Sequence, residues 1–444
     1  MPTLRQQIDT GAMSRHQWGT VALCMLLTII DGFDILVLAY TATSLTTEWA
    51  LSGSVLGLLL SAGLLGMAAG TMFVAPLADK IGRRPLVLIC LSSTTVAMFL
   101  SAFAENAVQM GILRVITGLG MGGIIVSANV LASEVSSKRW RGLAVSLNTV
   151  GYAFGATIVG IVAVAVQASY SWRGVFIVGA TMTLIALLVA SVRLPESVDF
   201  LYRSKKTNAL HQVNALAAKM NLSAVTDLET NSGTSRAGLR NALQTLLSVQ
   251  YRRTTVIICC GFFLTMFGYY FVQSWTPRLL VSAGLSESQG NLGGTLLNFG
   301  GMAGAAVLGI LVARLPLRRV LATYLAVSGV LLCVFAIAPS SLALAFTVAV
   351  LIGLFVNGCM AGLFTLATGS YESSIRSTAT GWATTVGRVG AIVAPVVAGG
   401  LVDLEWSTSA LYLLMSTSFF AASAAILMLK SARTETLQVD VVVR

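Results

Sequence analysis

The chain has 444 residues, of which 56% are hydrophobic and only 10% are charged, and its mean hydropathy is +0.84. Soluble domains carry about 25% charged residues, so this composition excludes a water-soluble globular protein and indicates a chain whose solvent is the lipid bilayer. The formal net charge of +11 would suggest nucleic acid as a partner of a soluble protein. In a membrane protein its meaning depends on where Lys and Arg lie relative to the apolar segments.

Apolar segments long enough to cross a bilayer as helices recur along almost the whole sequence. The first six expected helices span residues 17–41, 54–76, 85–103, 107–133, 139–166 and 173–194. After a polar stretch, six further apolar segments begin near residues 254, 288, 320, 341, 377 and 409. We therefore expect an all-α membrane protein with twelve transmembrane helices in two pseudo-symmetric bundles, residues 1–195 and 254–444, joined by a cytoplasmic central loop at residues 196–253.

Basic residues set the expected orientation, because short translocated loops lack Lys and Arg. Among the 28 Lys and Arg residues, those near expected outer loops or deep within spans are Arg114, Arg173, Arg278 and Arg388. Both termini are therefore predicted to lie in the cytoplasm. Lys205 and Lys206 in the central loop favour either contact with anionic lipid headgroups or, as we expect, a solvated linker.

Several classes of function lack the residues that they would need. The six cysteines lie in apolar stretches without metal-ligand or redox spacing, and only two histidines are present. The sequence contains no G-x-x-x-x-G-K-[ST] phosphate-binding loop. We therefore expect no metal, no cofactor, no nucleic-acid partner and no nucleotide-driven pumping. Neither the catalytic cluster of a membrane enzyme nor the pore lining of a channel is apparent.

The two halves of the sequence repeat weakly. Residues 134–142 open the fifth expected helix and residues 372–381 open the eleventh, with related patterns of Glu, Ser, Arg and Gly. Continuing the match places Tyr152 and Arg388 at equivalent positions on opposite sides of a central axis. Parallel six-helix repeats with a solute site at the midplane are typical of transporters that rock one half on the other. The sequence therefore predicts a secondary transporter, which we expect to be monomeric.

Two carboxylates lie deep in the first expected helix. Asp31 and Asp34 are three residues apart and share one helix face. Counting along the helices places Asp31 about 9 Å and Arg114 about 10 Å below the outer edge, so an Asp31–Arg114 ion pair is geometrically allowed. Such a pair could simply pin two helices together. Two carboxylates carry more charge than one arginine neutralises, however, so one of them could carry a proton and couple transport to the proton gradient.

Arg388 lies about 17 Å deep in the eleventh expected helix, near the midplane, and its own span has no nearby acidic residue. A guanidinium binds a carboxylate through two parallel hydrogen bonds, so an anionic substrate is one partner. The alternative is a buried arginine bonded to backbone carbonyls or to Asp34. Other residues that could line the substrate site, although each is individually consistent with ordinary packing, are Tyr152, Phe33, Tyr270 and Asn298.

Two short motifs carry a family resemblance. Residues 75–84 read A-P-L-A-D-K-I-G-R-R and residues 113–122 read L-R-V-I-T-G-L-G-M-G. They resemble the G-x-x-x-D-[RK]-x-G-[RK]-[RK] and R-x-x-x-G-x-G signatures of the major facilitator superfamily, with Ala75 in place of the leading glycine. The basic residues alone would satisfy the positive-inside rule. We favour a cytoplasmic latch that holds the outward-open state, formed by Asp79, Gly82, Arg83, Arg84, Glu134 and Arg141.

Within that superfamily, the sequence resembles the aromatic acid/proton symporters. The resemblance rests on residues 31–34, D-G-F-D, with Gly381-Trp382 and residues 387–392, G-R-V-G-A-I. It implies a bacterial inner-membrane protein that needs Asp31 and Asp34 for coupling and Arg388 for the substrate carboxylate. Asp79 and Arg83 would serve the conformational cycle. The pair Tyr371-Glu372 departs from the Tyr-Pro that is common in this family.

The resulting prediction is proton-coupled uptake of a small aromatic carboxylate such as benzoate or a hydroxybenzoate. Its partners would be the anionic substrate, the proton and the bilayer. Two alternatives stay open, namely a symporter for another organic anion such as muconate and a proton-coupled exporter of the same fold. The exporter alternative has some support because residues 394–400, A-P-V-V-A-G-G, are similar to an element of drug/proton antiporters.

Overall fold

The structure is a computed structural model, and it describes residues 4–203, 209–225, 245–246, 248–249, 251–337, 341–372 and 375–429. Every regular element in these residues is helical. The long helices are α2 (Arg15–Trp49), α3 (Gly53–Ala69), α5 (Arg83–Ser101), α6 (Ala107–Val135), α7 (Arg141–Arg193), α11 (Arg252–Ser282), α12 (Glu287–Val312), α13 (Leu317–Phe335), α14 (Leu342–Gly369), α15 (Arg376–Asp403) and α16 (Thr408–Leu427). The shorter elements are α1 (Leu4–Thr10), η1 (Gly70–Val74), η2 (Ala75–Leu77), α4 (Ala78–Ile81), α8 (Val198–Arg203) and α9 (Ala209–Lys219).

Within the described residues, 11 helical segments are long and apolar enough to cross a membrane. The all-α prediction is confirmed, and the difference from twelve arises in α7, which runs for 53 residues. A helix of that length would extend about 80 Å, more than twice the hydrocarbon core of roughly 30 Å. Ser171 interrupts α7 with a φ of 61° and a ψ of 176°. The expected helices at residues 139–166 and 173–194 lie on either side of this break.

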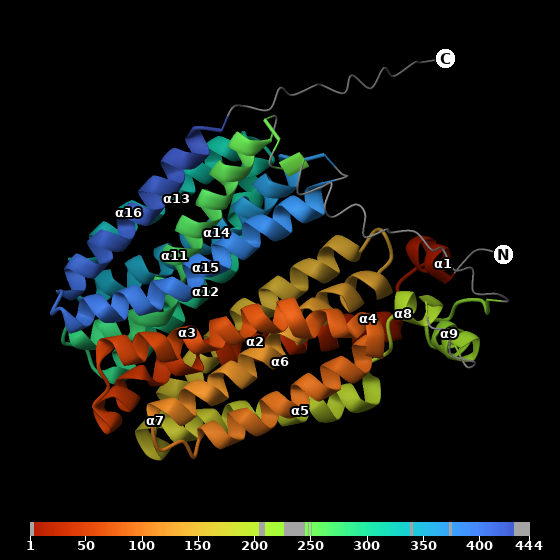
Figure 1. The fold of residues 1–444 in the computed structure, drawn as a ribbon, viewed down its shortest axis with the longest axis horizontal. Helices are drawn as coiled ribbons and strands as arrows, with labels where there is room; N and C mark the ends of the chain where they lie inside the picture. Colours follow the sequence, from red (N-terminus) through yellow and green to blue (C-terminus); the bar gives the residue numbers. More distant parts are fainter. Residues whose placement is uncertain are drawn as a thin grey trace.

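The helices pack as two groups with the same pattern of neighbours (Figure 1). In the first half, α1 to α9, α2 packs on α7, α3 on α6, and α5 on both α6 and α7. In the second half, α11 to α16, α11 packs on α15, α12 on α14, and α13 on α16. The weak repeat that the sequence indicates is thus also present in the structure, as the same pairing of helices in each half.

The two halves meet most closely at the end opposite the chain termini, where α3 packs on α15 (Figure 1). Gly57 lies directly against the backbone of Pro395, and a Cβ there would collide with the Pro395 carbonyl. The Asp403 carboxylate at the end of α15 accepts hydrogen bonds from Gly53 N (2.5 Å) and Ser54 N (2.8 Å) at the start of α3. These contacts close one end of the molecule, while the ribbons diverge toward the end that carries both termini.

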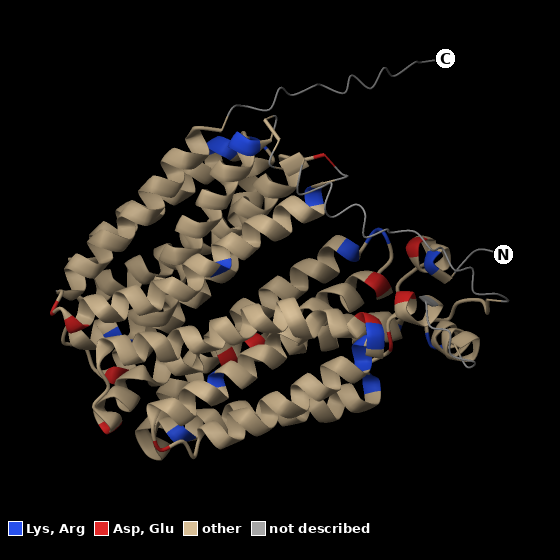
Figure 2. Cartoon of the chain, in the orientation of Figure 1, with Lys and Arg blue, Asp and Glu red and all other residues tan. Residues whose placement is uncertain are grey.

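Two stretches of the expected central loop are folded. Helices α8 and α9 bury apolar side chains such as Leu201 and Val213 against Leu4 and Ile8 of α1. The expectation of a solvated linker is therefore wrong for these stretches, because their apolar residues recur at helical spacing and find a partner in the N-terminal helix. Lys205 and Lys206 lie outside the described residues. Figure 2 shows charged residues gathered at this end of the first half.

Candidate functional site

Arg114 is held in a buried ion pair. Its Nη1 lies 2.9 Å from Asp34 Oδ1, and both side chains are 3% exposed. Its Nη2 donates to Ser101 Oγ at 3.0 Å, and the guanidinium carbon lies 5.1 Å from the centre of the Phe176 ring. The expected Asp31–Arg114 pair is therefore wrong. Counting residues fixes depth only to within a helical turn, and Asp34 lies about 4.5 Å farther along α2.

Asp31 has no such partner. Its side chain is 1% exposed, and its Oδ1 is buried without a hydrogen bond to any described residue. The groups within electrostatic range of this carboxylate on the neighbouring helices are Tyr152 of α7, Tyr270 of α11 and Arg388 of α15. Three of the predicted substrate residues and one predicted coupling residue thus come together from both halves of the molecule.

Arg388 is the cation of this group. Its side chain is half-buried and donates no hydrogen bond, and forms no ion pair, within the described part of the chain. The alternative that Arg388 pairs with Asp34 does not occur, because Asp34 is taken by Arg114. Arg388 can therefore offer its planar donor face to an anion.

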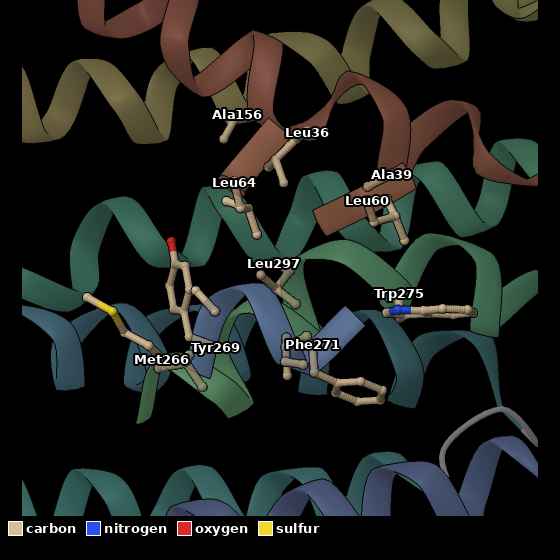
Figure 3. Close-up of a cluster of buried hydrophobic side chains, with 14 of the residues drawn as sticks. Leu36, Ala39, Leu60, Leu64, Ala156, Met266, Tyr269, Phe271, Trp275 and Leu297 are labelled. Atoms are coloured by element: carbon tan, nitrogen blue, oxygen red, sulfur yellow. The ribbon is translucent and has the colours of Figure 1, made fainter. Parts of the chain in front are cut away.

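A chain of hydrogen bonds beside this group was not predicted as a unit. Gln273 Nε2 donates to Tyr269 Oη at 3.2 Å, Tyr269 Oη donates to Asn357 Oδ1 at 3.3 Å, and Asn357 Nδ2 donates to Gly353 O at 3.0 Å. Tyr269 lies next to Tyr152, and Figure 3 shows its hydroxyl directed toward Ala156 of the first half. The only sign of this chain in the sequence is that Gln273, a polar residue in an apolar span, follows Tyr269 by four positions.

Two other predicted substrate residues lie elsewhere. Phe33 is 1% exposed and packs in the interior of the first half, where a Cβ on Gly179 would collide with its ring. Asn298 Nδ2 donates to Tyr40 Oη at 3.1 Å and to Gly294 O at 3.0 Å. Phe33 thus serves the core of the first half, and Asn298 holds α12 against α2.

Three of the predicted latch residues, Arg83, Arg84 and Glu134, lie in a charged network at the end of the first half that carries the N-terminus. Arg83 forms an ion pair with Glu134, which is 2% exposed, and donates to Ser197 Oγ at 2.8 Å. Ser197 Oγ in turn donates to Glu134 Oε2 at 2.7 Å. The Glu196 carboxylate accepts from the backbone N–H groups of Arg83 (2.8 Å) and Arg84 (3.2 Å). The sequence predictions did not include Glu196 and Ser197.

The remaining latch candidates have different surroundings. Gly82 has a φ of +105°, and the Glu196 carboxylate lies where a Cβ would be, so this position requires glycine. Arg141 pairs with Asp9 of α1 and donates to Ser133 O at 3.0 Å. Asp79 is exposed and has no hydrogen bond or ion pair with another described residue. These contacts of the latch candidates lie within the first half.

A comparison with protein families settles the membership of the chain. The model of the Major Facilitator Superfamily matches residues 24–306 and 258–440. The chain belongs to this superfamily. This membership confirms the resemblance to the superfamily that residues 75–84 and 113–122 carry. It places the chain among transporters rather than enzymes.

Curated relatives and solved structures extend this result. The gallate transporter of Pseudomonas putida is 29% identical over 428 residues, which are 96% of this chain and 94% of that protein. The 4-hydroxybenzoate transporter PcaK of Pseudomonas aeruginosa is 28% identical over 423 residues, covering 95% and 94%. A crystal structure of the D-xylose-proton symporter covers 93% of this chain and 97% of its own, with a TM-score of 0.71 and 17% identity. The structural likeness shows the fold of this facilitator.

The relatives also test the predicted resemblance to aromatic acid transporters within the superfamily. Together with the benzoate transport protein of Acinetobacter baylyi, which is 26% identical over 407 residues and covers 90% of this chain and 87% of its own, they are named for aromatic acids. The prediction that this facilitator resembles aromatic acid transporters is confirmed.

Proposed function

We propose that this facilitator takes up a small aromatic carboxylate together with protons by alternating access. The observation that carries the proposal is that Asp31 and Arg388, which belong to different halves, lie within electrostatic range of each other. Within the described part of the chain, Asp31 Oδ1 is buried without a hydrogen bond and Arg388 forms no ion pair. The names of the relatives support an aromatic acid as the substrate. Ionisable groups inside a membrane span are costly and mark substrate or proton pathways.

Coupling follows because Asp31 and the substrate carboxylate share one cation, Arg388. When Asp31 is ionised, it offsets the charge of Arg388 and competes with the substrate for it. When Asp31 holds a proton, the guanidinium is free to bind the substrate carboxylate through two hydrogen bonds. Occupancy by proton and anion together leaves the buried site with the same net charge as the empty site. In this proposal Asp34 fixes Arg114 and Asp31 carries the proton.

The membrane arrangement is part of the proposal. We infer that α7 crosses the bilayer twice, with Ser171 at the turn between crossings, which brings the 11 apolar segments to twelve spans. The basic residues support cytoplasmic termini, and the bacterial relatives support a bacterial inner membrane. With that orientation, the hydrogen bonds from Gly53 and Ser54 to Asp403 close the outer side, so the conformation is inward-facing. We propose that the protein acts as a monomer.

The predicted latch belongs to the same cycle. We propose that Asp79, exposed and without a described partner, meets the second half when the cytoplasmic side closes. The network of Arg83, Glu134 and Ser197 would hold the short helix α4 in place for that contact.

Uptake into proteoliposomes tests the proposed function. The purified chain is reconstituted, and uptake of radiolabelled 4-hydroxybenzoate and benzoate is measured with an inward proton gradient and after its collapse by a protonophore. We expect saturable uptake that requires the gradient and is absent from protein-free liposomes. An uptake rate that is the same with and without the gradient would contradict proton coupling. Absence of uptake for both acids would overturn the proposal in favour of muconate, another organic anion or an exporter.

A further inference from the structure

Gln273 of α11 presents a buried oxygen that has no partner among the described residues. Its side chain is 3% exposed, and its Nε2 donates to Tyr269 Oη at 3.2 Å. Its Oε1 is buried and accepts no hydrogen bond from any described residue. An unpaired buried polar atom costs about 1–3 kcal/mol, so this oxygen will favour any ligand that brings a donor to it.

The direction of the hydrogen-bond chain shows that the free end is an acceptor. The Gly353 carbonyl can only accept, so it must receive the amide N–H of Asn357. The oxygen of Asn357 then faces Tyr269, whose hydroxyl must donate to it. The Tyr269 oxygen is left to accept, so the end of the Gln273 amide that contacts it must be the nitrogen. The orientation of the Gln273 amide is therefore fixed by a backbone group, and its oxygen is the end left free.

Gln273 is joined through Tyr269 to the group around Arg388. Tyr269 is adjacent to Tyr152, and Tyr270 lies within electrostatic range of Arg388. Gln273 follows Tyr269 by four residues, so it occupies the same face of α11 about 6 Å farther along the helix. Figure 3 shows that this face, marked by the Tyr269 hydroxyl, is directed toward the first half.

We propose that Gln273 selects ring acids that carry a hydroxyl group, with Arg388 binding the carboxylate and Gln273 Oε1 accepting the ring hydroxyl. The inference rests on the proposed function and narrows its substrate class. A carboxylate has no proton to donate and would be repelled by the Gln273 oxygen, which fixes the orientation of the acid between the two residues. An unsubstituted ring would leave the buried oxygen unpaired, and sites built to bond a hydroxyl reject analogues without one.

Transport kinetics of paired substrates test the inference. The KM of the full chain in proteoliposomes is measured with 4-hydroxybenzoate and with benzoate, in the wild type and in Gln273→Met, which keeps the length of the side chain and removes the acceptor. We expect the wild type to favour the hydroxylated acid by roughly tenfold or more. We expect Gln273→Met to lose that preference by raising the KM for the hydroxylated acid while leaving the KM for benzoate unchanged or lower. Gln109→Met, the same change at an exposed position of α6, should keep the wild-type ratio.

A second variant protects the test against misfolding. Tyr269→Phe keeps the ring and removes the hydroxyl that orients the Gln273 amide, so the preference should fall here too. A wild type that transports both acids with equal KM, or a Gln273→Met ratio equal to that of the wild type, would overturn the inference and leave the proposed function intact. A wild type that transports neither acid would overturn the proposed function and this inference with it.

Discussion

Asp34 Oδ1 lies 2.9 Å from Arg114 Nη1, whereas Asp31, one turn earlier on the same face of α2, has a buried oxygen without a partner among the described residues. The two carboxylates therefore occupy different electrostatic environments despite their spacing. The pair with Arg114 joins α2 to α6 inside the first half, while Asp31 lies where the first half meets Arg388 of the second. This division of roles leads to different expectations for the two aspartates.

Replacing Asp34 with Asn should destabilise the protein. Arg114 is 3% exposed and would keep its charge without a counter-ion, a change that costs about 3–5 kcal/mol when one partner of a buried pair is removed. We expect a clearly lower melting temperature for Asp34→Asn in detergent, measured by intrinsic fluorescence. The double variant Asp34→Asn with Arg114→Gln should recover part of the loss because both charges are gone. An unchanged melting temperature for the single variant would contradict the structural role of the pair.

Replacing Asp31 with Asn should separate coupling from binding. The amide cannot carry a proton between the two sides but still leaves Arg388 free for the substrate carboxylate. We expect Asp31→Asn to lose accumulation driven by a proton gradient while keeping exchange of labelled for unlabelled acid across the membrane. Its melting temperature should stay close to the wild-type value, in contrast to Asp34→Asn. Gradient-driven accumulation by Asp31→Asn would rule out Asp31 as the proton carrier.

The sequence predicted the helices well because their apolar length and polar boundaries are local properties. The helix expected at residues 107–133 is observed at Ala107–Val135. Helices α8 and α9 were not predicted, because their apolar residues lie in a stretch that is polar as a whole. The sequence does not show that helical structure continues on both sides of Ser171 without an intervening loop, because a single residue with positive φ leaves no hydropathy signal.

Partners between helices were harder to predict, since they depend on the rotation of each helix about its axis. The choice between Asp31 and Asp34 for Arg114 depended on depth along one face of α2, which residue counting gives only to within a turn. The burial of Phe33 away from the group around Arg388 depended on the rotation of α2. Glu372, which the sequence left without a role, accepts a hydrogen bond from Tyr251 Oη at 2.9 Å. This hydrogen bond raises the pKa of the Tyr251 hydroxyl above its ordinary value, because ionisation of Tyr251 would place a second negative charge beside Glu372.

Removing the Arg388 guanidinium should weaken binding of the acid. Hydrogen bonds to charged groups contribute about 1.5–3 kcal/mol each, so loss of the two bonds in Arg388→Ala should raise the KM by about a hundredfold or more. The KM of Arg388→Lys should lie between those of the wild type and Arg388→Ala, because lysine keeps the charge and loses the planar pair of donors. Initial uptake rates over a range of substrate concentrations give the KM, with Arg193→Ala as an exposed control. An Arg388→Ala KM equal to that of the wild type would exclude Arg388 from the substrate site.

Removing the Asp403 carboxylate should open the end of the molecule opposite the termini. Gly53 N and Ser54 N would lose their charge-assisted bonds across the two halves, and each such bond contributes about 1.5–3 kcal/mol to the closed arrangement. Ser61 reports on this contact, because it is 4% exposed and its hydroxyl donates to Ile392 O at 2.6 Å. In a Ser61→Cys background, we expect Asp403→Ala to raise labelling by a membrane-impermeant maleimide applied from the outer side by about tenfold.

The native cysteines give the background for this labelling, so the Asp403→Ala variant without Ser61→Cys is measured alongside. Asp403→Asn keeps one oxygen that can accept from Gly53 or Ser54, and it should give an intermediate rate. A saturating ligand that favours the inward-facing state should lower the labelling rate, because it shifts the population back toward the arrangement that is closed on the outer side. Labelling of Ser61→Cys that is indifferent to Asp403 would mean that packing such as that of Gly57 on Pro395, rather than the carboxylate, holds this end closed.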